Sequence, residues 1–312
     1  MFKGNAIENI VPKLFRIFLR ASAVRSLKCN KPNVINLTHR FVTTSRLHLL
    51  YGLYHKLLKY KTAPILVYHT IGESSVSRFN LSLKAFTRQI DFLALNFRCI
   101  QLREILKELS LPRPVSDVIP VAITFDDGYR NLITHAHPIM EKYHIPYTVF
   151  VPTGFIGGLA SWRRDNHLPL LTDQELLELK RTGLVDFGSH TVHHCSMASL
   201  SEEEMTKEAR LSKNHLSELL QDDSVDMFAY PHGGPSDVSN QTARILRKIG
   251  YNLAVTNRSG SMNSYRRRLA LRRITFYEGD DERIMLAKLS GEYDWYYLKE
   301  LVANFARKLV FA

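Results

Sequence analysis

The chain has 312 residues, of which 45% are hydrophobic, and a formal net charge of +12. This length suits one sizeable core, such as a single α/β barrel of roughly 250 residues. Three widely spaced cysteines with no CxxC pair argue against a disulfide scaffold, and no run approaches the ~18 apolar residues of a transmembrane helix.

The positive charge is concentrated at the N-terminus. Up to residue 60 there are eleven basic residues and one acidic residue, Glu8, a net charge of +10. The rest of the chain is close to neutral, which argues against a nucleic-acid-binding body. We therefore predict a basic helical N-terminal extension over 1–61 and one folded domain over 62–312.

Three interpretations of the extension remain open. It resembles a basic amphipathic segment that lies on an anionic membrane, an Arg-rich organellar transit peptide, or a solvated arm without a partner. Its best apolar patch, 11–19, is interrupted by Lys13 and Arg16, so a secretory signal is not expected. These features predict a cytoplasmic protein. The alternative within this prediction is a cytoplasmic protein that associates with a membrane surface.

From residue 64 onward, buried-strand and amphipathic-helix patterns alternate. The predicted strands are 65–68, 118–125, 147–151, 185–188, 227–230, 252–256 and 269–276. The predicted helices are 79–95 with Ser82 as N-cap, 102–109, 131–143, 172–181 with a capping box, 201–220, 241–249 and a closing helix from 281. This alternation predicts an α/β fold with parallel strands, whose functional groups follow the strand ends.

Two adjacent carboxylates follow the strand 118–125. Residues 124–128 read TFDDG, so Asp126 and Asp127 stand before a glycine turn. There the two side chains can diverge, one binding a metal ion and the other acting as a general base. Alone, this motif would also fit an ordinary turn with exposed acids.

A second motif, HTVHH at 190–194, follows the strand 185–188. On one helical turn, His190 and His194 would share a face and could bind one ion. Together with Asp127 they form a His₂-carboxylate set that leaves a position open for water. His193 is interpreted as a neighbour without a role.

A third motif, FAYPHGG at 228–234, ends a strand in a Pro/Gly turn whose backbone can approach a ligand. Its amide groups could hold an oxyanion, although an ordinary turn explains the motif equally well in isolation.

In this order, the three motifs resemble the polysaccharide deacetylase (NodB-homology, carbohydrate esterase family 4) family over roughly residues 62–276. The early Val67-Tyr68-His69 is similar to the branch of bacterial poly-N-acetylglucosamine deacetylases. The resemblance implies a distorted (β/α) barrel and a divalent metal, usually zinc.

The resemblance also implies roles for individual residues. Asp126 is the implied general base, and the implied metal ligands are Asp127, His190 and His194. The implied substrate and oxyanion contacts are Tyr230, Pro231 and His232, with a backbone amide near His232.

The sequence departs from the family pattern at two points. Ala229 stands where many members have an arginine that tunes the base, and Arg273 is the candidate replacement, with a surface cation as the alternative. No histidine follows His232, so His69 is the candidate acid and His232 its runner-up.

The predicted function is metal-dependent removal of N-acetyl groups from an N-acetylhexosamine-containing polysaccharide or lipid-linked glycan. Hydrolysis of a non-sugar amide and a non-catalytic carbohydrate-binding role are the alternatives. Zinc suits the ligand set, which also tolerates cobalt, nickel or iron. Trp162, Tyr230 and Trp295 are candidate platforms for sugar rings, although aromatic residues are more often core.

Overall fold

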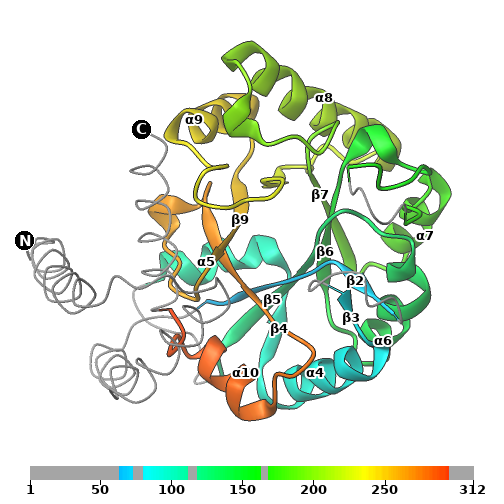
Figure 1. Cartoon of the computed structure of the whole chain (residues 1–312), viewed down its shortest axis with the longest axis vertical. Helices are drawn as coiled ribbons and strands as arrows, with labels where there is room; N and C mark the ends of the chain where they lie inside the picture. Colours follow the sequence, from blue (N-terminus) through cyan, green and yellow to red (C-terminus); the bar gives the residue numbers. More distant parts are fainter. Residues whose placement is uncertain (1–62, 73–79, 112–117, 163–167, 295–312) are drawn as a thin grey trace, which may run out of the picture. The chain divides into compact units, whose positions relative to one another are not determined.

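The computed structural model describes residues 63–72, 80–111, 118–162 and 168–294. They form a closed barrel of parallel strands surrounded by helices (Figure 1). All of them belong to the second of two compact units, 49–312. The predicted boundary at residue 61, and the membrane, transit-peptide and solvated-arm interpretations of 1–61, lie outside the described residues.

The barrel has seven strands in chain order. They are β1 (Ile65–Tyr68), β5 (Pro120–Phe125), β6 (Tyr147–Val151), β7 (Val185–Ser189), β8 (Met227–Ala229), β9 (Leu253–Ser259) and β10 (Leu271–Thr275). Every neighbouring pair is parallel, and β1 closes the barrel by pairing with both β5 and β10. The predicted distorted (β/α) barrel is confirmed.

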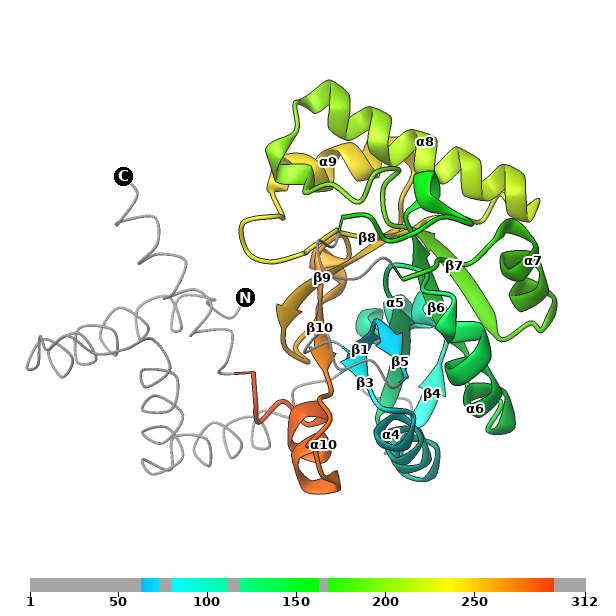
Figure 2. The same cartoon turned by 45° about the vertical axis from the view of Figure 1, so that its right-hand side comes forward.

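Helices cover the outside of the strands (Figures 1 and 2). They are α4 (Leu83–Asn96), α5 (Ile105–Ser110), α6 (His137–Lys142), α7 (Asp173–Arg181), α8 (Glu202–Leu220), α9 (Asn240–Ile249) and α10 (Glu282–Leu289). The predicted caps are confirmed: Ser82 accepts the amide of Ala85, and Thr172 forms a capping box with Glu175. Among the described residues, no helix combines the length and apolarity that crossing a membrane requires.

The two-residue period of the strands decides which side chains point into the barrel. Ala122 belongs to an apolar cluster with residues of β1, β6, β8, β9 and β10. Its neighbours Val121 and Ile123 pack in the outer cluster with residues of α4, α6 and α7. Thr124 and Asp126 continue the inward direction of Ala122, so they lie above the apolar interior at the carboxyl end of β5.

The structure adds elements that the sequence patterns did not indicate. A short strand, β4 (Arg98–Ile100), pairs with the first half of β5, and β2 (Thr70–Ile71) pairs with β3 (Asn80–Leu81). The predicted helix 131–143 begins with a π-helical turn, η2 (Leu132–Ala136). Segments of two or three residues are too short to show a period, so they have no clear signal in the sequence.

Candidate active site

A buried ion pair joins β10 to the end of β5. Arg273 binds Asp126 through two contacts, Nη1 to Oδ1 at 2.6 Å and Nη2 to Oδ2 at 2.5 Å. The remaining guanidinium hydrogens are donated to the Thr256 carbonyl, the Thr124 hydroxyl and the Asn257 side-chain oxygen. All five N–H groups of Arg273 therefore have an acceptor, as a buried guanidinium requires.

Arg273 and Asp126 are each only 1% exposed. The alternative that Arg273 is a surface cation is therefore wrong. Burial alone would raise the pKa of the Asp126 carboxyl, but the charge of Arg273 and that of nearby His190 outweigh it and lower the pKa below its ordinary value. Asp126 is thus held ionised at the carboxyl end of the barrel.

Three buried groups meet beside this ion pair. Oδ1 of Asp127 lies 3.4 Å from Nε2 of His190 and 3.0 Å from Nε2 of His194. One ligand atom from each residue falls within 4.8 Å of the others. The structure thus brings together the three side chains that the sequence motifs predicted as metal ligands.

The helical turn that would have placed His190 and His194 on one face is not present. Residues 190–195 lie outside any helix, and the chain instead turns through left-handed backbone at Thr191 (φ 65°) and His194 (φ 53°). A β-branched residue rarely adopts positive φ, and such strain is concentrated at functional sites. This irregular loop, rather than a helix face, places both imidazoles against Asp127.

Hydrogen bonds outside the ligand set hold the loop. Nδ1 of His190 lies 2.8 Å from the Ala229 carbonyl, which can accept only from a protonated nitrogen, so Nδ1 carries a proton and Nε2 is the ring nitrogen that faces Asp127. Glu208 of α8 accepts the backbone amides of Val192 and His193 at 2.9 and 3.0 Å and contacts the His193 ring at 2.6 Å. His193 therefore contacts Glu208, which holds the loop, and is not one of the three clustered residues.

We expect Glu208→Gln to weaken zinc binding about 10-fold, because removing an outer-shell partner typically costs 10–100-fold. The glutamine amide can accept at one oxygen only, so the two backbone amides and the His193 ring lose part of their anchor. Competition against a chromophoric chelator measures the affinity. Glu203→Gln, an exposed position on the same helix, is the matched control; equal affinities of the two variants would contradict the prediction.

The donor set fits a divalent cation. A carboxylate and two imidazoles match the ligands of catalytic zinc, and three protein ligands leave a position for water or substrate. The contact of the far ring nitrogen of His190 with a backbone carbonyl, which orients Nε2 toward the cluster, is an observation of this structure that favours such an ion.

His69, predicted as the acid, follows β1 and lies next to the ion pair. Its Nε2 is 4.0 Å from Oδ2 of Asp126, and its side chain is 12% exposed. Burial lowers the pKa of His69 below its ordinary value, although Asp127 and Asp126 act in the opposite direction. The imidazole is therefore neutral near pH 7 and lies between the ion pair and solvent.

The third motif occupies the turn after β8. Tyr230 is fully buried and its hydroxyl donates to the Leu269 carbonyl, so its interpretation as a sugar platform is wrong. Pro231 is buried, whereas His232 is exposed with its ring 5.1 Å from that of His194. A Cβ at Gly233 would meet the backbone nitrogen of Asn257 at 2.6 Å, so only glycine fits this turn.

Sequence reasoning missed several residues of the site. Thr124, Thr256 and Asn257 complete the shell of Arg273, and Glu208 supports the ligand loop. Trp162 was predicted as a sugar platform, but its indole stacks on the ring of His194. Trp295 lies outside the described residues.

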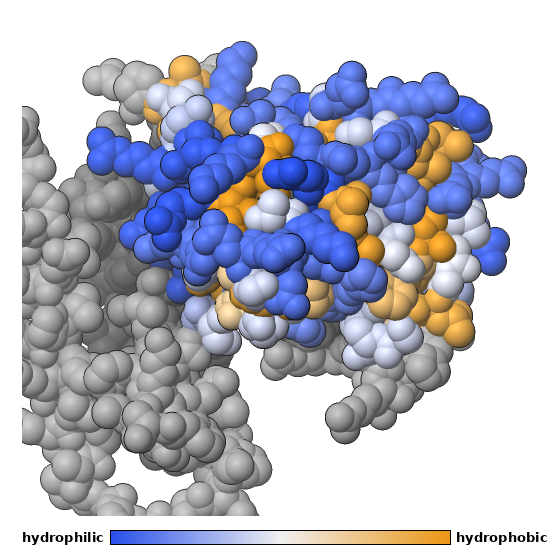
Figure 3. Space-filling view, turned by 90° about the horizontal axis from the view of Figure 1, so that it is seen from above, coloured by the Kyte–Doolittle hydropathy of each residue, from blue (hydrophilic) through white to orange (hydrophobic). Residues whose placement is uncertain are grey.

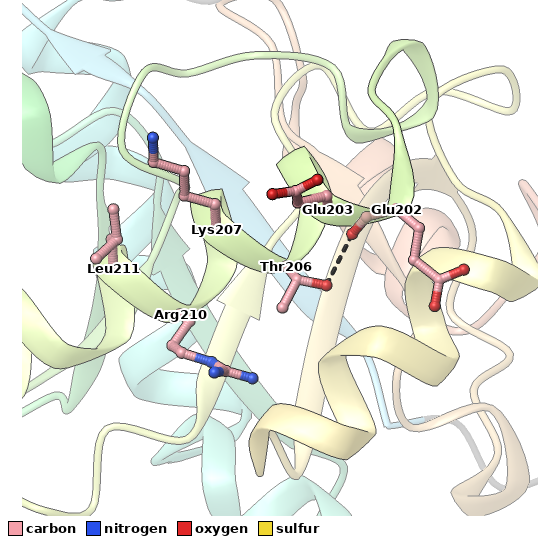
Figure 4. A pocket seen from close by; sticks show the side chains of 6 residues that line it. All are labelled: Glu202, Glu203, Thr206, Lys207, Arg210 and Leu211. Carbon is pink, nitrogen blue, oxygen red and sulfur yellow. Dashed lines mark hydrogen bonds between the residues drawn. The ribbon is translucent and has the colours of Figure 1, made fainter.

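The outer face of α8 also carries a depression of about 540 Å³, lined by residues of that helix alone (Figure 4). Its residues alternate with the buried positions Met205, Ala209 and Ser212, so it faces away from the barrel. Seen from above, the surface of the domain is mostly hydrophilic (Figure 3). The depression contains none of the residues of the site and has no part in it.

Fold and site together define a (β/α)-barrel protein with a buried His₂-carboxylate cluster beside an arginine-paired carboxylate. Residues 116–254 match the family model described as polysaccharide deacetylase. The chain is 26% identical over 225 residues to the poly-β-1,6-N-acetyl-D-glucosamine N-deacetylase of Staphylococcus aureus, which covers 68% of this chain and 73% of that one.

Two solved structures are similar as well. The deacetylase PplD of Streptococcus pyogenes, in complex with acetate, is 26% identical with a TM-score of 0.63 and covers 73% of this chain and 98% of that one. IcaB from Ammonifex degensii is 25% identical with a TM-score of 0.64 and covers 74% and 98%. The matched family model and these relatives bear out the predicted resemblance to the polysaccharide deacetylases and the predicted enzyme class, a deacetylase.

Proposed function

We propose that this protein is a metal-dependent hydrolase that removes the N-acetyl group from an N-acetylhexosamine unit of a saccharide, with Asp126 as general base. The observation that carries the proposal is the buried cluster of Asp127, His190 and His194 directly beside an Asp126 that Arg273 keeps ionised. The names of the relatives support the substrate class, since one acts on poly-N-acetylglucosamine and another is bound to acetate.

Asp127, His190 and His194 would hold the cation. A bound divalent ion would lower the pKa of a coordinated water to about 7 and polarise the amide carbonyl; zinc suits these ligands best. The proton transfers are carried out by side chains of this protein.

Asp126 takes the proton of the attacking water. Arg273 fixes the direction of the carboxylate because both oxygens are held in a fork, yet each oxygen keeps a second lone pair for a proton. The acetyl carbon gains the water oxygen, and its bond to the sugar nitrogen breaks.

His69 delivers a proton to the leaving nitrogen. Its distance of 4.0 Å to Asp126 allows the proton taken from water to pass on, since catalytic hydrogen bonds are often long before substrate binds. His232 is the alternative donor. The backbone N–H of His232, in the turn that Gly233 allows, would donate to the developing oxyanion.

Acetate release tests the proposal. The purified full-length protein is incubated with β-1,6-linked N-acetylglucosamine oligomers, lipid-linked N-acetylhexosamines and a non-sugar N-acetyl amide, each with zinc and then with a chelator. We expect acetate from a saccharide only, abolished by the chelator and restored by zinc.

Other outcomes would overturn parts of the proposal. Release from the non-sugar amide alone would reject the substrate class, and release that persists in the chelator would reject the metal. Zinc binding without turnover on any substrate would favour the non-catalytic alternative.

A further inference from the structure

The two histidines of the cluster are supported in different ways. His190 is fixed by the contact of its Nδ1 with the Ala229 carbonyl at 2.8 Å. Nδ1 of His194 is buried, and among the described residues it has no hydrogen-bond partner. Ligating histidines usually have such a partner, which sets the orientation of the ring. Within the described part of the chain, the contacts that can hold the His194 ring are therefore packing contacts.

Aromatic rings surround His194 instead. The indole of Trp162 is stacked on its imidazole, with centroids 4.3 Å apart and planes at 16°. The rings of His190 and His232 meet it edge-on at 4.9 and 5.1 Å. On Trp162, Phe155 makes an edge contact at 4.9 Å. Trp162 is therefore itself held in place, next to one metal-ligating ring.

Stacking opposes the motion that a missing hydrogen bond would permit. Rotation about the Cβ–Cγ bond turns the imidazole out of its plane and moves Nε2 away from Asp127. A parallel indole at this distance blocks that rotation, because the ring must pass through an orientation that collides with it. The backbone of His194 is left-handed, so the side chain has no regular element to fix it.

We propose that Trp162 is a positioning residue for the metal site: its indole holds the ring plane of His194, as the Ala229 carbonyl holds that of His190. The proposal rests on the cation site of the proposed function but not on its substrate. It also makes Trp162 a spectroscopic reporter of that site.

The test measures zinc affinity of the full-length apoprotein by competition with a chromophoric chelator. Trp162→Phe keeps a flat ring, whereas Trp162→Leu fills space without stacking. We expect the phenylalanine variant to bind like wild type and the leucine variant about 10-fold more weakly, the lower end for an outer-shell partner. Thermal melting in chelator checks that both apoproteins are folded and equally stable, so a difference in zinc affinity does not reflect unfolding.

Fluorescence gives a second readout that does not need activity. The chain has two tryptophans, Trp162 and Trp295. We expect Co²⁺ to quench part of the wild-type emission and expect this part to be absent from Trp162→Phe. Equal zinc affinity of Trp162→Leu and wild type, or the same quenching in Trp162→Phe, would overturn the proposal. Absence of acetate release would reject the proposed function alone, whereas a wild-type protein that binds no zinc would reject both.

Discussion

Asp126→Asn should bind zinc like wild type and release acetate about 10²–10⁴-fold more slowly, the range that general acid–base catalysis contributes. The amide has nearly the shape of the carboxylate but cannot accept the proton of the attacking water. Metal binding should survive because Asp126 is not among the three clustered ligands. Initial rates of acetate release at saturating zinc, with the metal content of the same samples, measure both effects.

Asp127→Asn is the matched control for this variant. Asp127 lies one residue further along the chain and contacts both imidazoles, so its amide variant should lose zinc together with turnover. A near-normal rate in Asp126→Asn would reject the general-base assignment. Loss of zinc in both variants would show that Asp126 belongs to the metal site.

The sequence predicted the barrel because its long strands and capped helices carry local signals. Apolar runs such as 147–151 and the capping box at Thr172 need no distant partner to be recognised. The candidate site residues at strand ends were recognised for the same reason, since TFDDG directly follows a buried strand.

Other features depend on contacts between distant parts of the chain. The sequence made Arg273 the candidate partner of the base but left a surface cation as the alternative; the structure shows that Arg273 points inward, in phase with Leu271 of the inner cluster. Glu208 is one of several acids on α8, and only its contact with Val192 and His193 distinguishes it. Spacing alone suggested a helix at 190–194, whereas left-handed backbone at Thr191 and His194 brings the histidines together.

Arg273→Met should destabilise the fold by about 3–5 kcal/mol at neutral pH, because it leaves the buried carboxylate of Asp126 without its partner. Methionine fills much of the same volume, so the loss is electrostatic more than steric. Urea unfolding of apoprotein in chelator measures the difference. A variant within about 1 kcal/mol of wild type, the value of an exposed pair, would contradict the buried ion pair.

The pH dependence of this difference has a defined sign. In wild type the pKa of Asp126 lies below its ordinary value, so its contribution to stability is present above the ordinary pKa and is lost as the pH falls through the lowered one. Without Arg273, burial raises the pKa of this carboxyl, which then protonates at a higher pH. The gap between wild type and Arg273→Met should therefore be largest near neutral pH and narrow as the pH falls.

A double variant separates the lost charge pair from lost packing. In Arg273→Met with Asp126→Asn no unpaired charge is buried, so the double variant should be more stable than Arg273→Met alone, a coupling expected of residues in direct contact. Arg273→Lys should recover part of the stability but little activity, since an ammonium supplies the charge without the fork that orients Asp126. Additive losses in the double variant would mean that Arg273 stabilises the barrel through Thr256 and Asn257 rather than through Asp126.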